Sequence, residues 1–387
     1  MFSIGILGFL VWSYMMALQF CEELVINLAI CWNSSKSWNT INWSKNFHRW
    51  TQSAGNLYYI VIAKIITNKV SSETTRKTSF NFTSFHQIRS HFYTNLPIIE
   101  NQWLEWFIGF TEGDGSIITS IKAKQPRLRF VITQKEKEIL YHIQDILGFG
   151  YVRHIEKGNY YRYFVEDNKH IYILCHLFNG NLVIEHRKNQ LEKWILFINS
   201  IIEKETSYIQ TRHNITTKIN INNSIYNISL KDAWLSGFSD AEGNFTCEIK
   251  TYKYKSNCNI RFILDQNKEI ILLNFISNLF LSGTIYKRKE TLCAYRLQIR
   301  SIKSIKVIYD YFTKFKLKTI KKYSFDKWCV IYTIIINKEH LTKEGIDKIL
   351  ILSKNININN AQNKAIGKAK VLLKDEDIVQ QYYVFLL

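Results

Sequence analysis

The chain repeats itself, and this internal repeat constrains the possible folds more than any other feature. Residues 106–117, WFIGFTEGDGSI, match residues 234–245, WLSGFSDAEGNF. Three further blocks match in the same order: 129–140 with 261–272, 161–165 with 295–299, and 187–194 with 321–328. The offset between the copies grows slowly from 128 to 134 residues, as expected of a duplicated domain with small loop insertions. We therefore expect two copies of one domain.

Within each copy the hydrophobic pattern changes its period where a helix gives way to strands. After 241–243 the apolar residues Phe245, Cys247 and Ile249 alternate with polar ones, which is typical of a half-buried strand. The pattern predicts an α+β fold of two pseudo-symmetric αββαββα domains. The expected parts are a leader and linker at 1–95, the first domain at 96–200, a linker at 201–229, the second domain at 230–350 and an extension at 351–387.

Small residues recur four positions apart near the end of the first helix of each copy. They are Gly109 and Gly113 in the first copy, and Gly237 and Ala241 in the second. This spacing places both members of a pair on one helix face. Small residues on such a face let two helices approach at backbone distance, so we expect the two helices to pack side by side. The glycines that follow, Gly115 and Gly243, suit a helix exit with positive φ.

An acid stands directly before each of these exit glycines. Asp114 and Glu242 therefore lie at helix C-termini, where the helix dipole places about half a negative charge. A carboxylate is unfavourable there unless a cation is bound nearby. If the two helices pack side by side, the acids converge, and two carboxylates with last-turn carbonyls suit a hard divalent cation such as Mg²⁺. Mg²⁺ held in this way can polarise a scissile phosphate. A solvated helix end is the alternative interpretation.

Both segments resemble the LAGLIDADG motif of homing endonucleases and intron maturases. The resemblance covers residues 101–350 and includes the motif twice, at corresponding places in the repeat. It implies a motif-helix pair at the interface of two LAGLIDADG domains and a DNA-binding saddle of antiparallel sheets. It also implies one metal-binding catalytic acid per motif, Asp114 and Glu242, assisted by the carbonyls of Gly113 and Ala241. We expect Glu112 and Asp240 to cap or structure the motif instead of binding metal.

Two further sets of polar residues repeat between the copies. Gln134 and Gln266 follow matching strands, and the resemblance suggests that they orient water or a phosphate; a solvated strand end is the alternative. Basic pairs open matching helices, Arg187-Lys188 and Lys321-Lys322, and one cation of each pair could stabilise charge that develops on the scissile phosphate. We favour Lys188 and Lys322 as catalytic, although a plain phosphate contact is equally consistent with the pattern.

The charge of the chain suits a nucleic-acid partner. Lys and Arg number 51 against 32 Asp and Glu, a net charge of +19, and each neutralised phosphate releases condensed counterions. Basic residues on or beside predicted strands can contact phosphates or guanine in the major groove. Trp194 and Trp328 recur at helical positions and are expected in the core. The candidate DNA-binding residues are Lys122, Lys124, Arg127, Arg129, Arg162, Lys250, Lys253, Lys255, Arg261, Arg296 and Arg300.

The first 20 residues form an uncharged leader that is long enough to span a hydrocarbon layer of about 30 Å. Residues 1–13 resemble a stretch of cytochrome c oxidase subunit one, a mitochondrial membrane protein. The only methionines, Met1, Met15 and Met16, lie in this leader. We expect an intron reading frame fused to its upstream exon and a product in the mitochondrial matrix; a genuine membrane anchor is the alternative. The 7 cysteines are scattered without a CxxC pair and indicate neither a disulfide framework nor a zinc site.

Two functions are compatible with these residues. The first is an intron-encoded homing endonuclease: a monomer that makes a Mg²⁺-dependent double-strand break in a specific DNA site and needs no protein partner. The second is a maturase that helps its own group I intron RNA to fold and splice. The same basic surface could serve both, so the two activities can coexist.

Overall fold

The computed structural model describes residues 80–357 apart from short gaps at 123–124, 205–206, 224–227, 253–254 and 289–293. All of these residues belong to one compact unit, Lys77–Leu387. The leader predicted at 1–20 and most of the extension predicted at 351–387 lie outside the described residues. Among the described residues, no helix is both long and apolar enough to cross a membrane.

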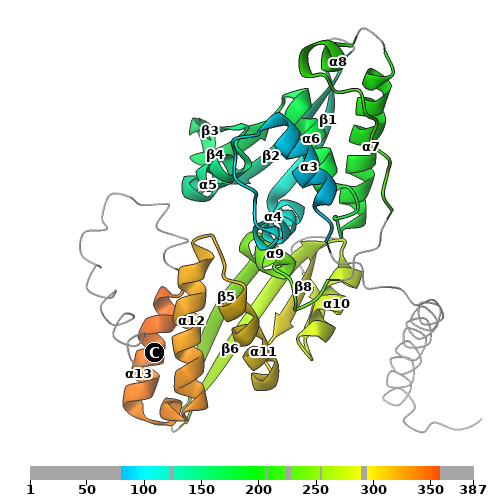
Figure 1. The fold of residues 1–387 in the computed structure, drawn as a ribbon. Helices are drawn as coiled ribbons and strands as arrows, with labels where there is room; N and C mark the ends of the chain where they lie inside the picture. The colour runs from blue at the N-terminus through cyan, green and yellow to red at the C-terminus, as the bar shows by residue number, and fades with distance from the viewer. Residues whose placement is uncertain are drawn as a thin grey trace, which may run out of the picture. The chain divides into compact units, whose positions relative to one another are not determined.

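The repeat in the sequence is also a repeat of structure (Figure 1). The first copy contains α4 (Asn101–Asp114), β1 (Gly115–Lys122), β2 (Gln125–Gln134), α5 (Lys137–Leu147), β3 (Tyr151–Ile155), β4 (Tyr160–Val165), α6 (Asn168–Phe178) and α7 (Glu185–Ile202). The second contains α9 (Trp234–Glu242), β5 (Gly243–Tyr252), β6 (Lys255–Asn267), α10 (Ile270–Leu279), β7 (Thr284–Lys287), β8 (Ala294–Ile299), α11 (Ile302–Lys314) and α12 (Lys321–Ile336), followed by α13 (Lys343–Asn355).

Each copy contributes one antiparallel sheet of four strands, in the orders β1-β2-β4-β3 and β5-β6-β8-β7. The central strands pair at equivalent positions, with Phe130 opposite Val165 in the first sheet and Phe262 opposite Ile299 in the second. These four side chains are buried, and the residues that alternate with them lie on the opposite face. The predicted α+β fold of two pseudo-symmetric domains is therefore confirmed.

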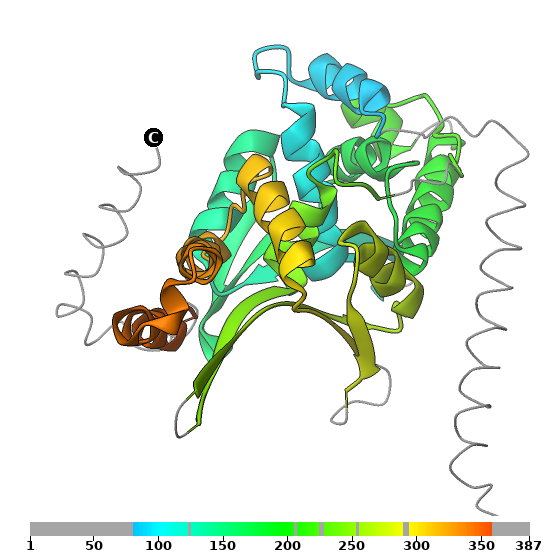
Figure 2. The same cartoon turned by 90° about the horizontal axis from the view of Figure 1, so that it is seen from below.

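Helices cover one face of each sheet. α5, α6 and α7 contact the first sheet, and α10, α12 and α13 contact the second. Figure 2 shows the strands of the second sheet curving, with the helices on their convex side. We call the other surface of each sheet its open face; it carries the side chains that alternate with the buried ones, such as Arg129 beside Phe130 and Arg261 beside Phe262. The open faces are thus available for a large ligand.

The polar segment before Pro97 is not the linker that its composition suggests. Residues Thr83–Phe92 form helix α3, and Phe85 is completely buried. The Arg89 guanidinium donates to the carbonyls of Ile146 (3.1 Å), Leu147 (3.4 Å) and Pro97 (2.7 Å). These carbonyls include the end of α5, where cations and donors satisfy the unpaired C=O groups. The first domain therefore begins before residue 96, and the linker prediction was wrong for α3.

The segment at 201–229, also predicted as a linker, packs against the first domain. It contains α8 (Tyr208–His213), and Ile209, Ile215 and Ile219 are buried. The Asn199 side chain of α7 both donates to the Ile219 carbonyl and accepts from the Ile219 N–H, at 2.9 Å each. The Asn/Thr-rich composition of the segment concealed these three buried isoleucines, so composition alone missed this packing.

Candidate active site

The motif helices α4 and α9 pack side by side through their small residues. A Cβ atom on Gly109 would lie 1.9 Å from the Trp234 carbonyl oxygen. A Cβ atom on Gly237 would lie 1.8 Å from the Trp106 carbonyl oxygen. No side chain fits at these distances, so glycine is required at both positions. The close helix contact predicted from the four-residue spacing is present.

Two crossed hydrogen bonds join the motif helices. The Trp106 indole N–H donates to Asp240 Oδ2, and the Trp234 indole N–H donates to Glu112 Oε2, both at 2.7 Å. The two carboxyl groups are almost completely buried. Burial raises the pKa of Glu112 to about 7 and raises the pKa of Asp240 above its usual value. Each tryptophan therefore satisfies a buried acid on the partner helix.

The same two acids hold the chain just before α7 in the first domain and just before α12 in the second. Glu112 Oε1 accepts from the backbone N–H groups of Val183 (2.8 Å) and Ile184 (2.6 Å), at the start of α7. Asp240 accepts from the N–H groups of Lys318 (2.7 Å) and Thr319 (3.2 Å), at the start of α12. Glu112 and Asp240 thus act as the structural residues that we expected, and they fix where α7 and α12 begin.

Asp114 and Glu242 end the two motif helices at neighbouring points. A Cβ atom on Gly113 would lie 2.3 Å from Ala241 Cβ and 3.3 Å from Glu242 Cγ, so the ends of the helices touch. Each acid has a glutamine beside it. The Gln134 amide donates to Asp114 Oδ2, and the Gln266 amide lies 3.5 Å from Glu242 Oε1. The structure brings together the two acids and the two glutamines that the repeat singled out.

The exit glycines have a different role from the one predicted. Gly115 has φ −80° and Gly243 has φ −78°, so both are extended and neither needs positive φ. A Cβ atom on Gly115 would lie 2.5 Å from the Thr111 carbonyl oxygen, and one on Gly243 would lie 2.6 Å from that of Ser239. Each motif helix passes directly into a strand, and glycine is needed because that junction brings the backbone against the last helical turn.

The two side chains of each basic pair lie in different environments. The Lys321 ammonium donates to the carbonyls of Ala241 (2.6 Å) and Ser239 (3.3 Å), at the end of α9. Burial lowers the pKa of Lys321, and the charges of Asp114, Asp240 and Glu242 oppose that shift. Lys321 is therefore the cation of the second copy that lies among the acids.

Arg187 occupies the equivalent place in the first copy. Its guanidinium lies 3.5 Å from the Glu112 carbonyl oxygen and bonds to Gln190 Oε1 at 3.2 Å. Burial lowers its pKa, and the charges of Glu112, Glu242 and Asp114 oppose the shift. Arg187 and Lys321 are thus the inward-facing members of the two pairs.

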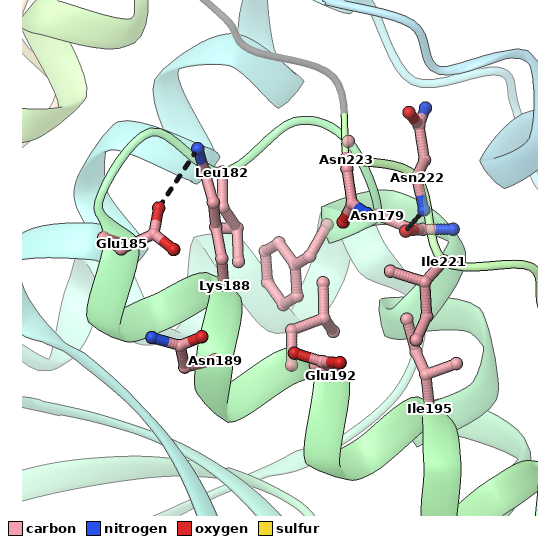
Figure 3. Close-up of a pocket in the computed structure, with 13 residues that line it drawn as sticks. Asn179, Leu182, Glu185, Lys188, Asn189, Glu192, Ile195, Ile221, Asn222 and Asn223 are labelled. Atoms are coloured by element: carbon pink, nitrogen blue, oxygen red, sulfur yellow. Dashed lines mark hydrogen bonds and ion pairs between the residues drawn. The ribbon is translucent and has the colours of Figure 1, made fainter. Parts of the chain in front are cut away.

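This geometry favours Arg187 and Lys321 over the predicted Lys188 and Lys322, because the favoured pair lies nearer the acids. Lys322 is exposed. Lys188 lies beside a pocket between the end of α6 and the start of α7, where its ammonium pairs with Glu185 at 3.7 Å (Figure 3). A sequence signal could have found the inward members. Trp194 and Trp328 stand seven residues after Arg187 and Lys321, and a spacing of seven keeps two residues on one helix face.

The environment of the two acids favours a bound cation. Burial raises the pKa of Asp114 to about 6, although Lys321 and the Gln134 hydrogen bond oppose the shift. Burial also raises the pKa of Glu242 to about 7, and the nearby Asp114 adds to that shift. Raised pKa values mean that the ionised carboxylates are under-compensated, and a divalent cation would compensate both.

The donor set fits a hard divalent cation held by Asp114 and Glu242. Among the described residues, no group of three or more His, Cys, Asp or Glu is placed to hold a metal ion. An ion here would therefore complete its shell with carbonyl, water or phosphate oxygens, as Mg²⁺ does. Gly113 and Ala241, whose carbonyls were predicted as metal ligands, directly precede Asp114 and Glu242 at the ends of α4 and α9. The Ala241 carbonyl already accepts a hydrogen bond from Lys321, so an ion bound there would share this oxygen with the ammonium group.

The predicted DNA-binding residues lie on the open faces. Arg127, Arg129 and Arg162 alternate with buried or partly buried residues of the first sheet, and Arg261 and Arg296 do the same in the second; Lys250 is exposed beside the partly buried Ile249. Arg300 is exposed just after β8. The side chains of Lys122, Lys124, Lys253 and Lys255 lie outside the described part. Both sheets thus present basic residues on the face that carries no helix.

The two tryptophans of α7 and α12 are core residues, as predicted. Trp194 and Trp328 are completely buried. Their indole N–H groups donate to backbone carbonyls of the sheets beneath them, to Ile118 at 3.1 Å and to Arg261 at 3.2 Å. Neither ring is available to stack on a base.

Comparison with known proteins agrees with this architecture. The family model described as LAGLIDADG endonuclease matches residues 107–198 and 235–332, one block for each copy of the repeat. The chain belongs to the LAGLIDADG endonuclease family. The two matched blocks begin inside α4 and α9, so both copies of the LAGLIDADG motif described above fall within them.

Two curated relatives align with most of this LAGLIDADG chain. It is 33% identical over 270 residues to "Probable intron-encoded endonuclease 4" of Neurospora crassa, an alignment that covers 67% of the chain and 45% of that relative. The chain thus spans less than half the length of that protein. It is 28% identical over 298 residues to the "Uncharacterized cox1 intron-2 37.2 kDa protein" of Schizosaccharomyces pombe, covering 77% of the chain and 82% of the relative.

A solved structure shares the LAGLIDADG fold. It is described as the LAGLIDADG meganuclease I-AabMI bound to uncleaved DNA, and it is 24% identical with a TM-score of 0.53. The match covers 66% of this chain and 98% of the meganuclease. At this identity the likeness bears on the fold, which agrees with the two four-stranded sheets seen here.

Proposed function

We propose that this chain is a homing endonuclease that cuts both strands of a specific DNA site with the help of a divalent cation, Mg²⁺ or an ion like it. The observation that carries the proposal is the convergence of Asp114 and Glu242 at the touching ends of α4 and α9. Each acid has a glutamine beside it. The cations Lys321 and Arg187 lie within electrostatic reach of both acids.

The residues can divide the work of phosphodiester hydrolysis between them. Asp114 and Glu242 would hold the cation, which when bound polarises the phosphate and favours deprotonation of a water molecule. Gln134 and Gln266 are placed to orient that water through their amide groups. Lys321 and Arg187 can stabilise the charge that develops on the phosphate oxygens as one P–O bond forms to water and another breaks.

The open faces supply the DNA-binding surface of this proposal. The meganuclease of similar fold was solved with uncleaved DNA, and the net charge of +19 favours a polyanion here. Because the chain contains both motifs, a single chain holds both candidate acids and can act as a monomer. Arginines on paired strands can read base edges in the major groove.

The names of the relatives favour an intron origin. One is called an intron-encoded endonuclease and another a cox1 intron-2 protein. With the resemblance of residues 1–13 to cytochrome c oxidase subunit one, they support an intron reading frame of that mitochondrial gene. We propose action in the mitochondrion, where cleavage of the intronless allele would promote intron mobility. Maturase activity toward the intron RNA stays a prediction, which splicing of that intron with and without the protein would test.

Cleavage of a defined DNA tests the proposal. The full chain is incubated with Mg²⁺ and DNA that spans the intronless junction of the cytochrome oxidase gene from the same genome. We expect a double-strand break at one site, and none after chelation of the metal. Asp114→Asn and Glu242→Gln should each abolish double-strand cleavage but retain DNA binding. Asp310→Asn, a matched loss of one carboxylate on α11, is the control. Undiminished cleavage in both active-site variants would contradict the assignment of the acids.

A further inference from the structure

The open faces carry carboxylates, although a DNA-facing surface disfavours negative charge. Glu166, Glu248 and Asp265 lie among the basic residues, where each would repel a nearby phosphate. Each of them pairs with an arginine of the same face. Glu166 binds Arg129 at 2.5 Å and Glu248 lies 3.5 Å from Arg261. Such a carboxylate repels phosphate but holds an arginine in place. This suggests that the position of the arginine matters more for DNA binding than the positive charge that the carboxylate neutralises.

The pairing is closest at Asp265. Arg296 Nε donates to Asp265 Oδ1 at 2.7 Å, and Arg296 Nη2 donates to Oδ2 at 2.6 Å. This two-point contact fixes the plane of the guanidinium as well as its position. Arg288 Nη1 also donates to Oδ2 at 3.1 Å. Both oxygens of Asp265 are thus used to hold arginine.

The Arg296 guanidinium has a shape that suits guanine, and it also hydrogen-bonds to Tyr286, the residue opposite it on β7. A guanidinium has five N–H donors in a rigid fork, and Asp265 takes two of them along the Nε–Nη2 edge. The end of the fork carries further N–H groups on Nη1 and Nη2. Two such parallel donors match the O6 and N7 acceptors of guanine in the major groove. A fixed fork loses less freedom on binding than a mobile one and rejects a base pair that lacks these acceptors.

The first copy has the same arginine but a different partner. Arg162 stands where Arg296 stands in the repeat, and Thr133 stands where Asp265 stands. Arg162 makes a single hydrogen bond, from Nε to Thr133 Oγ1 at 3.2 Å, and its guanidinium lies over the Tyr160 ring at 5.1 Å. One bond does not fix the plane of the guanidinium. The two halves of the surface therefore differ at equivalent positions.

Both pairs adjoin the candidate active site. Thr133 directly precedes Gln134, and Asp265 directly precedes Gln266, the glutamines beside the two acids. Arg162 and Arg296, which lie opposite Thr133 and Asp265, would therefore contact the base pairs next to the cleaved phosphates. Any difference between the halves is thus placed where it affects which sites are cut.

We infer that Asp265 is a positioning residue that fixes Arg296 to read a guanine near the cleavage centre, so that this half of the target is selected more strictly than the half contacted through Arg162. The inference rests on the proposed function, because it assumes that the open faces bind DNA. It goes beyond that function by assigning base selectivity to one half and by giving the carboxylate its role.

Selection from a pool of randomised duplex DNA tests this inference. The full chain is used without divalent cation, so that only binding is measured and any effect on Glu242 does not enter. Bound duplexes are sequenced, and affinities are then measured for every single-base change in the enriched site. For Asp265→Asn we expect loss of preference at one or two adjacent base pairs. The discrimination lost there should be about 5- to 150-fold, the range of one bidentate contact.

Matched variants separate positioning from charge and from misfolding. Arg296→Lys keeps the charge but not the fork, and should lose preference at the same base pairs. Thr133→Ala changes the equivalent position of the first copy and should leave the preference of its half almost unchanged. Asp310→Asn removes a carboxylate on α11 and should retain the wild-type profile. Thermal melting of each variant checks that it is folded.

The possible outcomes separate a failure of the proposed function from a failure of this inference. If the wild type enriches no sequence, site-specific DNA binding fails, and the inference fails with it. If the wild type enriches a site and Asp265→Asn keeps the same base preferences, the inference alone is overturned. A uniform gain in affinity without a change in preference also overturns it, because Asp265 would then act only through its charge.

Discussion

The contact between α4 and α9 leads to a quantitative prediction for Gly237→Ala. The added Cβ atom would lie 1.8 Å from the Trp106 carbonyl oxygen, whereas real Cβ atoms essentially never approach closer than 3.0 Å. The helices must therefore separate by about 1.2 Å at this point. Because the atom that is met belongs to the backbone of a buried helix, no side-chain rotation can relieve the clash.

Two losses should follow from this separation. Overpacking of a well-packed contact costs typically about 1–3 kcal/mol, and we expect the free energy of unfolding to fall by about 3 kcal/mol, at the upper end. The separation also displaces Asp114 from Glu242, and a misplacement of about 1 Å can cost about 100-fold in rate. Urea unfolding measures the first loss, and single-turnover cleavage of the target DNA measures the second.

Gly283→Ala is the matched control for this prediction. Its Cβ atom would meet Leu297 Cδ1 at 2.5 Å and Ser277 Oγ at 2.7 Å, which are ends of side chains that can rotate. It lies outside the motif helices, so cleavage should stay near the wild-type rate. Gly109→Ala, which meets the Trp234 carbonyl oxygen at 1.9 Å, should behave like Gly237→Ala. If Gly237→Ala matched the control in both assays, the helix contact would not position the acids as argued.

Three further predictions follow from the site and its support. Lys321→Met should reduce single-turnover cleavage by about 100-fold, the effect of removing one donor to a developing charge, whereas Lys322→Met should leave the rate almost unchanged; equal effects would contradict the assignment of the inward cation. Because the pKa values of Asp114 and Glu242 are raised to about 6 and 7, protons compete with the cation below neutral pH. Calorimetric affinity for Ca²⁺ should therefore fall as the pH is lowered from 8 to 5, and a constant affinity would speak against these ligands. Arg89→Ala should lower the free energy of unfolding in urea by about 2 kcal/mol, because it leaves the carbonyls at the end of α5 without their charged donor; an unchanged midpoint would mean that α3 adds nothing to the domain.

Several features followed from the sequence because they depend on local geometry. The repeat required two equivalent domains, and the four-residue spacing of Gly109 and Gly113 placed both on one helix face. The position of Asp114 and Glu242 at helix ends came from the same local pattern. Alternation along the strands placed Arg127 and Arg129 on the face opposite the core. Helix and strand periods are properties of the backbone, so they can be recognised before the fold is known.

Other features depended on which surfaces meet in the folded chain. Nothing in the order of residues showed that Trp106 would donate to Asp240, 134 residues away, or that α3 would lie against α5. The packing of α12 decided that Lys321, and not Lys322, reaches the acids, since neighbouring helical residues point about 100° apart.

The sequence by itself determined that two domains meet through glycine-lined helices with an acid at each end. Only the tertiary structure decided which cation reaches those acids and which carboxylate holds each arginine. Periodicity fixes the direction of a side chain relative to its own helix or strand. A hydrogen bond or ion pair between distant segments also depends on where the packed core places each element, because donor and acceptor must lie about 3 Å apart.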